Sequence, residues 1–120
     1  MGDYRTLLAY QKSFSLSMKI YHRSKKFPTE EKFGLTSQIR NSSRSVCVNI
    51  VEAYKRRRYK NYFISKLNDS ETENAETQVW LDFSLACDHI NKDEYEEFKS
   101  NNDEVAKLIL YMINHPDKFT

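Results

Sequence analysis

The 120-residue sequence has very few of the residues that interrupt helices. It contains two glycines and two prolines, whereas ordinary usage is about 7% and about 5% of a chain. A β-sandwich or barrel needs such turn residues every few positions, so their scarcity argues against both architectures. Long helices joined by few connections are predicted instead.

The sequence also lacks long apolar runs. No stretch of it approaches the roughly 20 consecutive apolar residues that span a membrane, and no apolar leader begins it. We therefore expect a cytoplasmic protein that has no membrane partner.

Cysteine and histidine are too few and too scattered to predict a metal centre. Cys47 and Cys87 lie 40 positions apart, which matches neither a zinc-binding pair nor a disulfide framework. His22, His89 and His115 are expected at surface positions at or near helix ends, and none pairs with a cysteine at metal-ligand spacing. We therefore expect reduced thiols, no metal and no cofactor.

Apolar and charged residues are plentiful, and the charge is unevenly distributed. Hydrophobic residues make up 39% and aromatic residues 13% of the chain, which is enough for the core of one domain. The net charge is only +2, yet residues 40–60 carry seven basic residues and one acidic residue, which gives +6. Residues 68–97 carry ten acidic residues and one basic residue, which gives −9. Such polarity affects partners more than it affects the fold.

Apolar spacing predicts the first two of four helices. The first covers residues 4–24, where one stripe of the helical period is formed by Leu7, Phe14, Met18 and Tyr21. Pro28 ends this helix, Gly34 can supply a left-handed turn, and Thr36 or Ser37 can cap the next helix. The second helix is predicted over residues 37–57, with a buried side that contains Ile39, Val46, Ile50 and Ala53.

The third helix is predicted over residues 60–90. It is apolar at both ends, but its middle, "NDSETEN", is polar throughout, so it cannot be an ordinary core helix over its whole length. Asn91, with Glu94 three positions on, forms a capping-box variant that starts a fourth helix, which Pro116 stops. The prediction is an all-α fold, an antiparallel up-and-down four-helix bundle in which residues 1–120 form a single domain.

Two short motifs make the sequence similar to a known family. They are FPxxExxGLxxQIR and NIxE, formed here by Phe27, Pro28, Glu31, Gly34, Leu35, Gln38, Ile39, Arg40, Asn49, Ile50 and Glu52. The chain resembles the four-helix-bundle proteins encoded in intervening sequences of 23S ribosomal RNA, which are related to the accessory variability protein of diversity-generating retroelements. The resemblance implies a ring-like homopentamer with no established enzymatic activity. The retroelement relative binds a reverse transcriptase and nucleic acid through a basic surface. Ala53 stands where the family usually has glycine, so the helix is expected to continue there without a kink.

Two arginines of the second helix are open to two interpretations. If the second and third helices form a hairpin that turns near Tyr59, residues whose numbers add to about 118 lie opposite each other. This register places Arg44 beside Glu73 and Arg40 beside Glu76, so carboxylate pairing within or between subunits is favoured. Phosphate binding by the same arginines is the alternative.

Further polar residues are assigned to the same interhelical network. Acid–base catalysis by Glu52 with Glu76 is the sharper alternative, but no nucleophile, metal-ligand cluster or phosphate loop accompanies them. A hydrogen-bonded structural network is therefore favoured over an active site, and no catalytic residue is predicted. Its predicted members are Gln38, Arg40, Arg44, Asn49, Glu52, Glu73, Glu76 and Gln78.

The best functional lead is a basic cluster at the end of the second helix. It consists of Lys55, Arg56, Arg57, Arg58 and Lys60, interleaved with tyrosines. Basic side chains with aromatic neighbours suit phosphate contact and base stacking. Cations at a helix C-terminus are also favoured by the helix dipole, by about 0.3–1 kcal/mol, which is a wholly structural reason for them.

The sequence therefore supports two functions. The first is a non-enzymatic, homo-oligomeric accessory or scaffold protein that binds RNA or DNA non-specifically through the basic cluster. The alternative is a protein-interaction module without nucleic-acid binding, whose charges serve subunit assembly or a protein partner.

Overall fold

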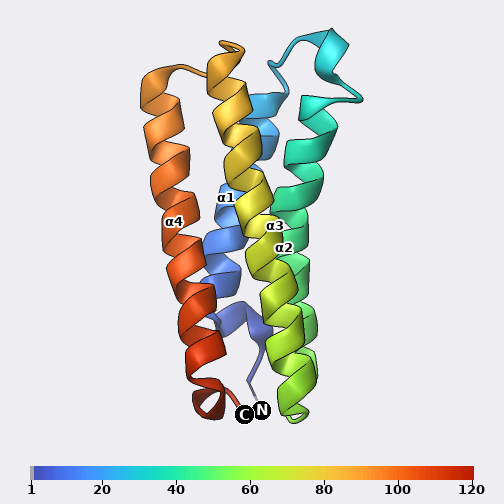
Figure 1. The fold of residues 1–120 in the computed structure, drawn as a ribbon, viewed down its shortest axis with the longest axis vertical. Helices are drawn as coiled ribbons and strands as arrows, with labels where there is room; N and C mark the ends of the chain where they lie inside the picture. Colours follow the sequence, from blue (N-terminus) through green and yellow to red (C-terminus); the bar gives the residue numbers. More distant parts are fainter. Residues whose placement is uncertain (1) are drawn as a thin grey trace.

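The computed structural model describes residues 2–120 as an elongated bundle of four antiparallel helices, 44 × 25 × 20 Å in extent (Figure 1). The helices are α1 (Leu8–Ser24), α2 (Leu35–Lys55), α3 (Lys60–Ala86) and α4 (Lys92–Asn114). Short 3-10 segments are η1 (Tyr4–Thr6), η2 (Thr29–Glu31) and η3 (Pro116–Lys118). No strand occurs in residues 2–120, and the expected all-α up-and-down bundle is confirmed. None of the helices described is long and apolar enough to cross a membrane.

Each helix packs against its two neighbours in the bundle. α2 and α3 share the most extensive contact, and α1 packs against both α2 and α4. Both chain termini and the α2–α3 turn lie at one end of the bundle, and the other two connections lie at the opposite end (Figure 1). We call these the turn end (residues 2–7, 56–59 and 115–120) and the loop end (residues 25–34 and 87–91).

The apolar core is divided into two clusters. The larger one, towards the turn end, contains Val46, Ile50, Phe63, Leu67 and Ile109 among its buried members. The smaller one, towards the loop end, is formed by Leu16, Ile20, Ile39, Leu81, Ile90 and Phe98. The buried side predicted for α2 is confirmed, because Ile39, Val46, Ile50 and Ala53 are all at most 3% exposed.

A layer of small polar residues accounts for the polar middle of α3. Ser70 donates to the Val46 carbonyl at 2.8 Å, and Thr77 bonds to Ser42 at 2.9 Å. All three hydroxyl side chains are buried. The stretch is therefore two-sided: Ser70 and Asn74 are buried against α2 and α4, whereas Asn68, Asp69, Glu71 and Thr72 are exposed. The buried polar groups are hydrogen-bonded, as burial of such groups requires.

The buried face of α1 differs from the predicted stripe. Phe14 and Met18 are 49% and 38% exposed, and Leu7 precedes the helix. The side that faces the core instead carries Ala9, Ser13, Leu16, Ser17, Ile20 and Ser24. Small residues let the backbones approach closely, as the Ser17–Ser43 hydroxyl contact of 3.2 Å illustrates. Leu7 is buried as predicted, but the prediction was wrong for Phe14 and Met18, because hydrophobicity alone counts a buried serine as a surface residue.

Helix ends follow local chemistry, with corrections at two of them. The predicted capping box at Asn91 and Glu94 is present. α2 begins at Leu35 rather than Ser37, and Gly34 has φ −111°, so it makes no left-handed turn. α3 stops at Ala86 rather than residue 90, and Asp88 takes the left-handed conformation with φ 60°.

Candidate nucleic-acid interface

The basic cluster forms the tight turn between α2 and α3. Lys55 is the last residue of α2, and Lys60 is the first residue of α3. The backbone N–H of Arg56 donates to Ala53 and that of Tyr59 donates to Arg56, so the turn closes without glycine or proline. Every basic residue of the cluster is exposed except Arg57, which is half-buried.

Each arginine of the cluster lies over a tyrosine ring. The guanidinium carbons of Arg56 and Arg58 stand 5.4 Å and 5.1 Å from the ring centroids of Tyr62 and Tyr59. Such contacts at exposed sites are worth about 0.5–1 kcal/mol and restrict the motion of the side chain. The turn therefore presents arginines with adjacent aromatic rings, a combination that suits a nucleic-acid backbone with its bases.

Arg57 has a structural task within the cluster. Its Nη1 donates to the Tyr54 carbonyl at 2.8 Å, and its guanidinium lies 4.0 Å from the Tyr54 ring centroid. The bond satisfies one of the last carbonyls of α2, which have no partner within the helix. The dipole-related explanation of these charges thus accounts for Arg57 more directly than for Arg56 or Arg58.

Carboxylates neutralise little of the cluster. Lys60 reaches Asp117 at 3.5 Å, but both side chains are more than half exposed, so the pair contributes little. Asp3 lies near Lys55, although its lowered pKa comes first from the backbone N–H of Arg5. Among residues 2–120, neither Arg56 nor Arg58 forms an ion pair with a carboxylate.

Arg40 and Arg44 do not meet the glutamates of α3. Nε of Arg40 donates to Ser24 Oγ at 2.7 Å, and both guanidiniums lie over the ring of Tyr21, at 4.9 Å and 5.6 Å. These partners belong to α1, so the predicted pairing with Glu73 and Glu76 within the chain is wrong. Burial and the neighbouring Glu76 raise the pKa of Glu73, as expected for a carboxylate that has no arginine beside it.

The predicted hairpin register is nevertheless correct. Lys66 of α3 pairs with Glu52 of α2 at 3.1 Å, and their numbers add to 118. The Thr77–Ser42 and Ser70–Val46 bonds differ from that sum by at most two. Register fixes only the height of a residue along the bundle, whereas the rotation of α2 turns its arginines towards α1.

The remaining predicted network residues are dispersed. Asn49 bonds within its own helix, to the carbonyl and hydroxyl of Ser45 at 3.0 Å and 3.1 Å. Gln38 lines a groove with Trp80 and Phe83. Arg40 and Glu52 contact neighbouring helices, and Gln78 takes part in a larger network that bridges two helices through several residues.

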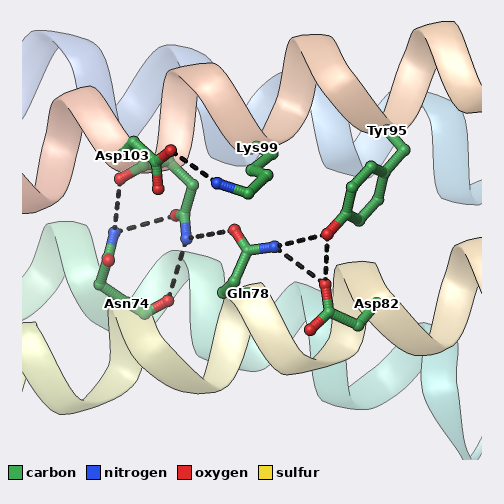
Figure 2. A network of polar contacts seen from close by, with 7 residues as sticks. Asn74, Gln78, Asp82, Tyr95, Lys99 and Asp103 are labelled. Carbon is green, nitrogen blue, oxygen red and sulfur yellow. Dashed lines mark hydrogen bonds and ion pairs between the residues drawn. The ribbon is translucent and has the colours of Figure 1, made fainter.

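That network joins α3 to α4 and was largely missed (Figure 2). Asn74 Nδ2 donates to Asn102 Oδ1 at 2.9 Å, and Asn102 Nδ2 donates back to the Asn74 carbonyl at 3.1 Å. Gln78 links this pair to Asp82 and to the Tyr95 hydroxyl, at 3.0 Å and 3.3 Å. The available signal was the position of Asn102, four residues after Phe98 on the apolar stripe of α4.

A second group, of side chains with metal-binding atoms at the loop end, was also missed. Glu31 Oε2 lies 2.9 Å from His89 Nε2, and the ligand atoms of Glu31, Cys87 and His89 all lie within 4.8 Å of one another. His89 is not a surface residue, since only 11% of its side chain is exposed. Hydrogen bonds from His89 and from the Leu35 N–H lower the pKa of Glu31.

Comparison with known proteins places the whole bundle in one family. Residues 5–111 match the family described as 23S rRNA-intervening sequence protein. The chain is also similar to the crystal structure of a protein of unknown function from the S23 ribosomal protein family of Bacteroides thetaiotaomicron. The two share 30% sequence identity with a TM-score of 0.82, over 89% of this chain and 96% of that chain. No curated protein matches the chain. The match runs from η1 into α4, and the chain therefore belongs to the family of 23S rRNA-intervening sequence proteins.

Proposed function

We propose that this chain is a non-enzymatic, homo-oligomeric accessory protein that binds nucleic acid non-specifically through the basic cluster. The observation that carries the proposal is the state of Arg56 and Arg58. Both are exposed, both lie over tyrosine rings, and neither has a carboxylate partner among residues 2–120. Structural needs of the turn explain Arg57, but they leave these two guanidiniums unexplained.

The chemistry of the cluster favours backbone contact over base readout. When exposed cations of a protein contact phosphates, they displace the counterions condensed on the nucleic acid. This displacement gives affinity without sequence information. Tyr59 and Tyr62 are 52% and 37% exposed, so their rings can also stack on unpaired bases. Single-stranded RNA or DNA is accordingly the expected ligand, with steep salt dependence.

Self-association is the second part of the proposal. Several large apolar side chains remain exposed on the isolated chain, including Phe14, Met18, Val48, Val79 and Phe83. Burial of such residues between copies would remove apolar surface from water. A homopentamer is the arrangement that the family resemblance implies, and it would repeat the basic cluster on every subunit and so multiply a weak contact. A cytoplasmic location also belongs to the proposal, supported by the two free cysteines.

The test is a fluorescence-anisotropy titration with short single-stranded RNA and DNA at low and moderate salt. The key variant is Arg56→Glu/Arg58→Glu, which spares Arg57 and its bond to Tyr54. The matched control is Lys25→Glu/Lys26→Glu, an equal charge change on exposed residues of the loop end. Native mass spectrometry on each sample records the oligomer.

The wild type is expected to bind with an affinity that falls as salt rises, by a slope of about 0.7 per phosphate contacted in a single strand. The Arg56→Glu/Arg58→Glu variant is expected to bind at least roughly tenfold more weakly than the wild type, whereas the control variant should keep most of the wild-type affinity. Equal losses in both variants would contradict a localised interface. Loss of assembly in the turn-end variant alone would favour the alternative, a protein-interaction module whose charges serve the oligomer.

A further inference from the structure

Three side chains with metal-binding atoms converge at the loop end, far from the basic cluster. Glu31 comes from η2, Cys87 follows α3, and His89 lies in the connection to α4. Their carboxylate, thiol and imidazole atoms all lie within 4.8 Å of one another. We propose that Glu31, Cys87 and His89 bind one Zn²⁺ ion.

The carboxylate of Glu31 is held in position by the start of α2. Its Oε1 accepts from the Leu35 N–H at 3.2 Å, and this leaves Oε2 facing His89 Nε2 at 2.9 Å. Gly34 gives the carboxylate room, because a Cβ at that position would stand only 3.0 Å from Glu31 Oε1 and would require a small shift of it. A fixed outer contact of this kind orients a metal ligand before the ion arrives.

The chain reversal after α3 brings the other two ligands to the same side. Asp88 takes φ 60°, and the His89 N–H then donates to the Ser84 carbonyl at 2.8 Å. The imidazole packs on Phe27 with ring centroids 5.3 Å apart. The His89 carbonyl accepts from Arg23 at 2.8 Å. His89 is therefore positioned by contacts with its ring and its backbone.

The donor set fits zinc better than other common divalent ions. Sulfur, nitrogen and oxygen together suit Zn²⁺, whereas Mg²⁺ and Ca²⁺ take oxygen ligands. Zinc bonds of about 2.0–2.3 Å at tetrahedral angles separate ligand atoms by about 3.5 Å. The ligands must therefore close by about 1 Å from their widest spacing, which rotation of the exposed Cys87 side chain can supply.

Charge and space are also compatible with the ion. A thiolate and a carboxylate balance the two positive charges, while the imidazole binds neutral through Nε2. Binding then releases the Cys87 thiol proton to solvent, moves the imidazole hydrogen to Nδ1 and replaces the Glu31–His89 hydrogen bond by two metal bonds. A groove of about 260 Å³ adjoins Glu31 and Cys87, with room for a water as fourth ligand.

The bound ion would fasten two connections that are distant in sequence. Residues 25–34 and residues 87–91 would be joined through the metal, and the folded state would gain the binding free energy. Zinc binding is independent of nucleic-acid binding, because the two sites occupy opposite ends of the bundle (Figure 1).

The test uses untagged, chelator-treated protein and Zn²⁺ or Co²⁺ alone as the probe. Zinc affinity is measured by competition with a chromogenic chelator, and cobalt reports thiolate ligation through its near-ultraviolet charge-transfer band. The variants are Cys87→Ser and His89→Gln, of which the first changes an exposed residue and is expected to fold normally. The controls are Cys47→Ser, at the other cysteine of the chain, which is buried, and His115→Gln, both outside the cluster.

The wild type is expected to bind one Zn²⁺ per chain, show the cobalt–thiolate band and melt at a higher temperature with zinc than with chelator. Each ligand variant is expected to bind zinc at least roughly tenfold more weakly, a loss of about 1.4 kcal/mol, and Cys87→Ser to lose the band. The controls should retain wild-type binding. Absence of zinc binding by the wild type, or binding that both ligand variants leave unchanged, would overturn the proposal.

Discussion

Replacing Asn102 by alanine is expected to destabilise the bundle strongly, although the residue is polar and distant from both proposed sites. Asn102 and Asn74 are 2% and 6% exposed and lie between the two halves of the apolar core. Each amide nitrogen donates to the other residue, at 2.9 Å and 3.1 Å. Water cannot readily replace either partner at this depth, so each amide depends on the other.

The magnitude depends on the groups that the substitution leaves unpaired. Asn102→Ala removes two hydrogen bonds that contribute about 1 kcal/mol each. It leaves Asn74 Nδ2 with only the longer bond of 3.3 Å to the backbone carbonyl of residue 102, and it leaves the Asn74 carbonyl without the Asn102 amide, at a desolvation cost of about 1–3 kcal/mol. Because these terms overlap, we expect the free energy of unfolding to fall by about 2–4 kcal/mol in total. That is a large share of the roughly 5–15 kcal/mol typical of a folded domain.

The assay is urea unfolding followed by far-ultraviolet circular dichroism at one fixed protein concentration, since assembly would otherwise shift the midpoint. Asn102→Ala, Asn74→Ala and the double variant complete a cycle, with the exposed Asn68→Ala as a matched control expected within about 0.5 kcal/mol of wild type. The double variant should cost less than the sum of the singles by about 0.5–3 kcal/mol. Additive losses, or a single-variant loss no larger than that of Asn68→Ala, would refute the reasoning.

Three further outcomes are expected. Asp88→Gly should stabilise the fold by up to about 1 kcal/mol in urea unfolding, because φ 60° costs a residue with a Cβ but not glycine; a loss of stability would contradict this. The Tyr95 hydroxyl donates to Asp82 at 2.6 Å, and this bond raises the pKa of Tyr95 to about 12. The resulting stabilisation of the fold is complete below the ordinary pKa of 10.0 and is lost as pH rises towards 12. Because Tyr95 is expected to ionise last, an ultraviolet titration of the Tyr95→Phe variant should lack the last phenolate step. Glu73→Gln should stabilise the fold at neutral pH but not below the ordinary pKa of 4.5, because burial and Glu76 raise the pKa of Glu73 and disfavour its carboxylate; equal effects at both pH values would count against that cause.

Much of the bundle could be predicted because its signals are local. The Asn91 capping box, the stop before Pro116 and the apolar side of α2 depend on neighbouring residues along one helix. The hairpin register follows from the position of one short turn, and the Lys66–Glu52 pair agrees with it. The basic cluster was likewise visible as a run in the sequence.

The rotation of each helix was harder to predict, because it depends on the neighbours that a helix meets. Serines allow α1 to bury a side that hydrophobicity marks as polar, and this leaves Phe14 exposed. The same rotation places Tyr21 beneath Arg40 and Arg44, which were expected to meet α3. A period identifies the possible sides of a helix, but only packing decides which one is buried.

The sequence by itself determined four helices, their order, their register and the cluster of charge at one turn, since caps, periodicity and breakers act over a few residues. Tertiary structure alone decided which polar groups share a buried layer, that Arg57 serves the turn while Arg56 and Arg58 remain exposed, and that Glu31 meets Cys87 and His89. The reason is that these contacts join residues as much as 58 positions apart, whose meeting depends on how the helices pack and not on local preference.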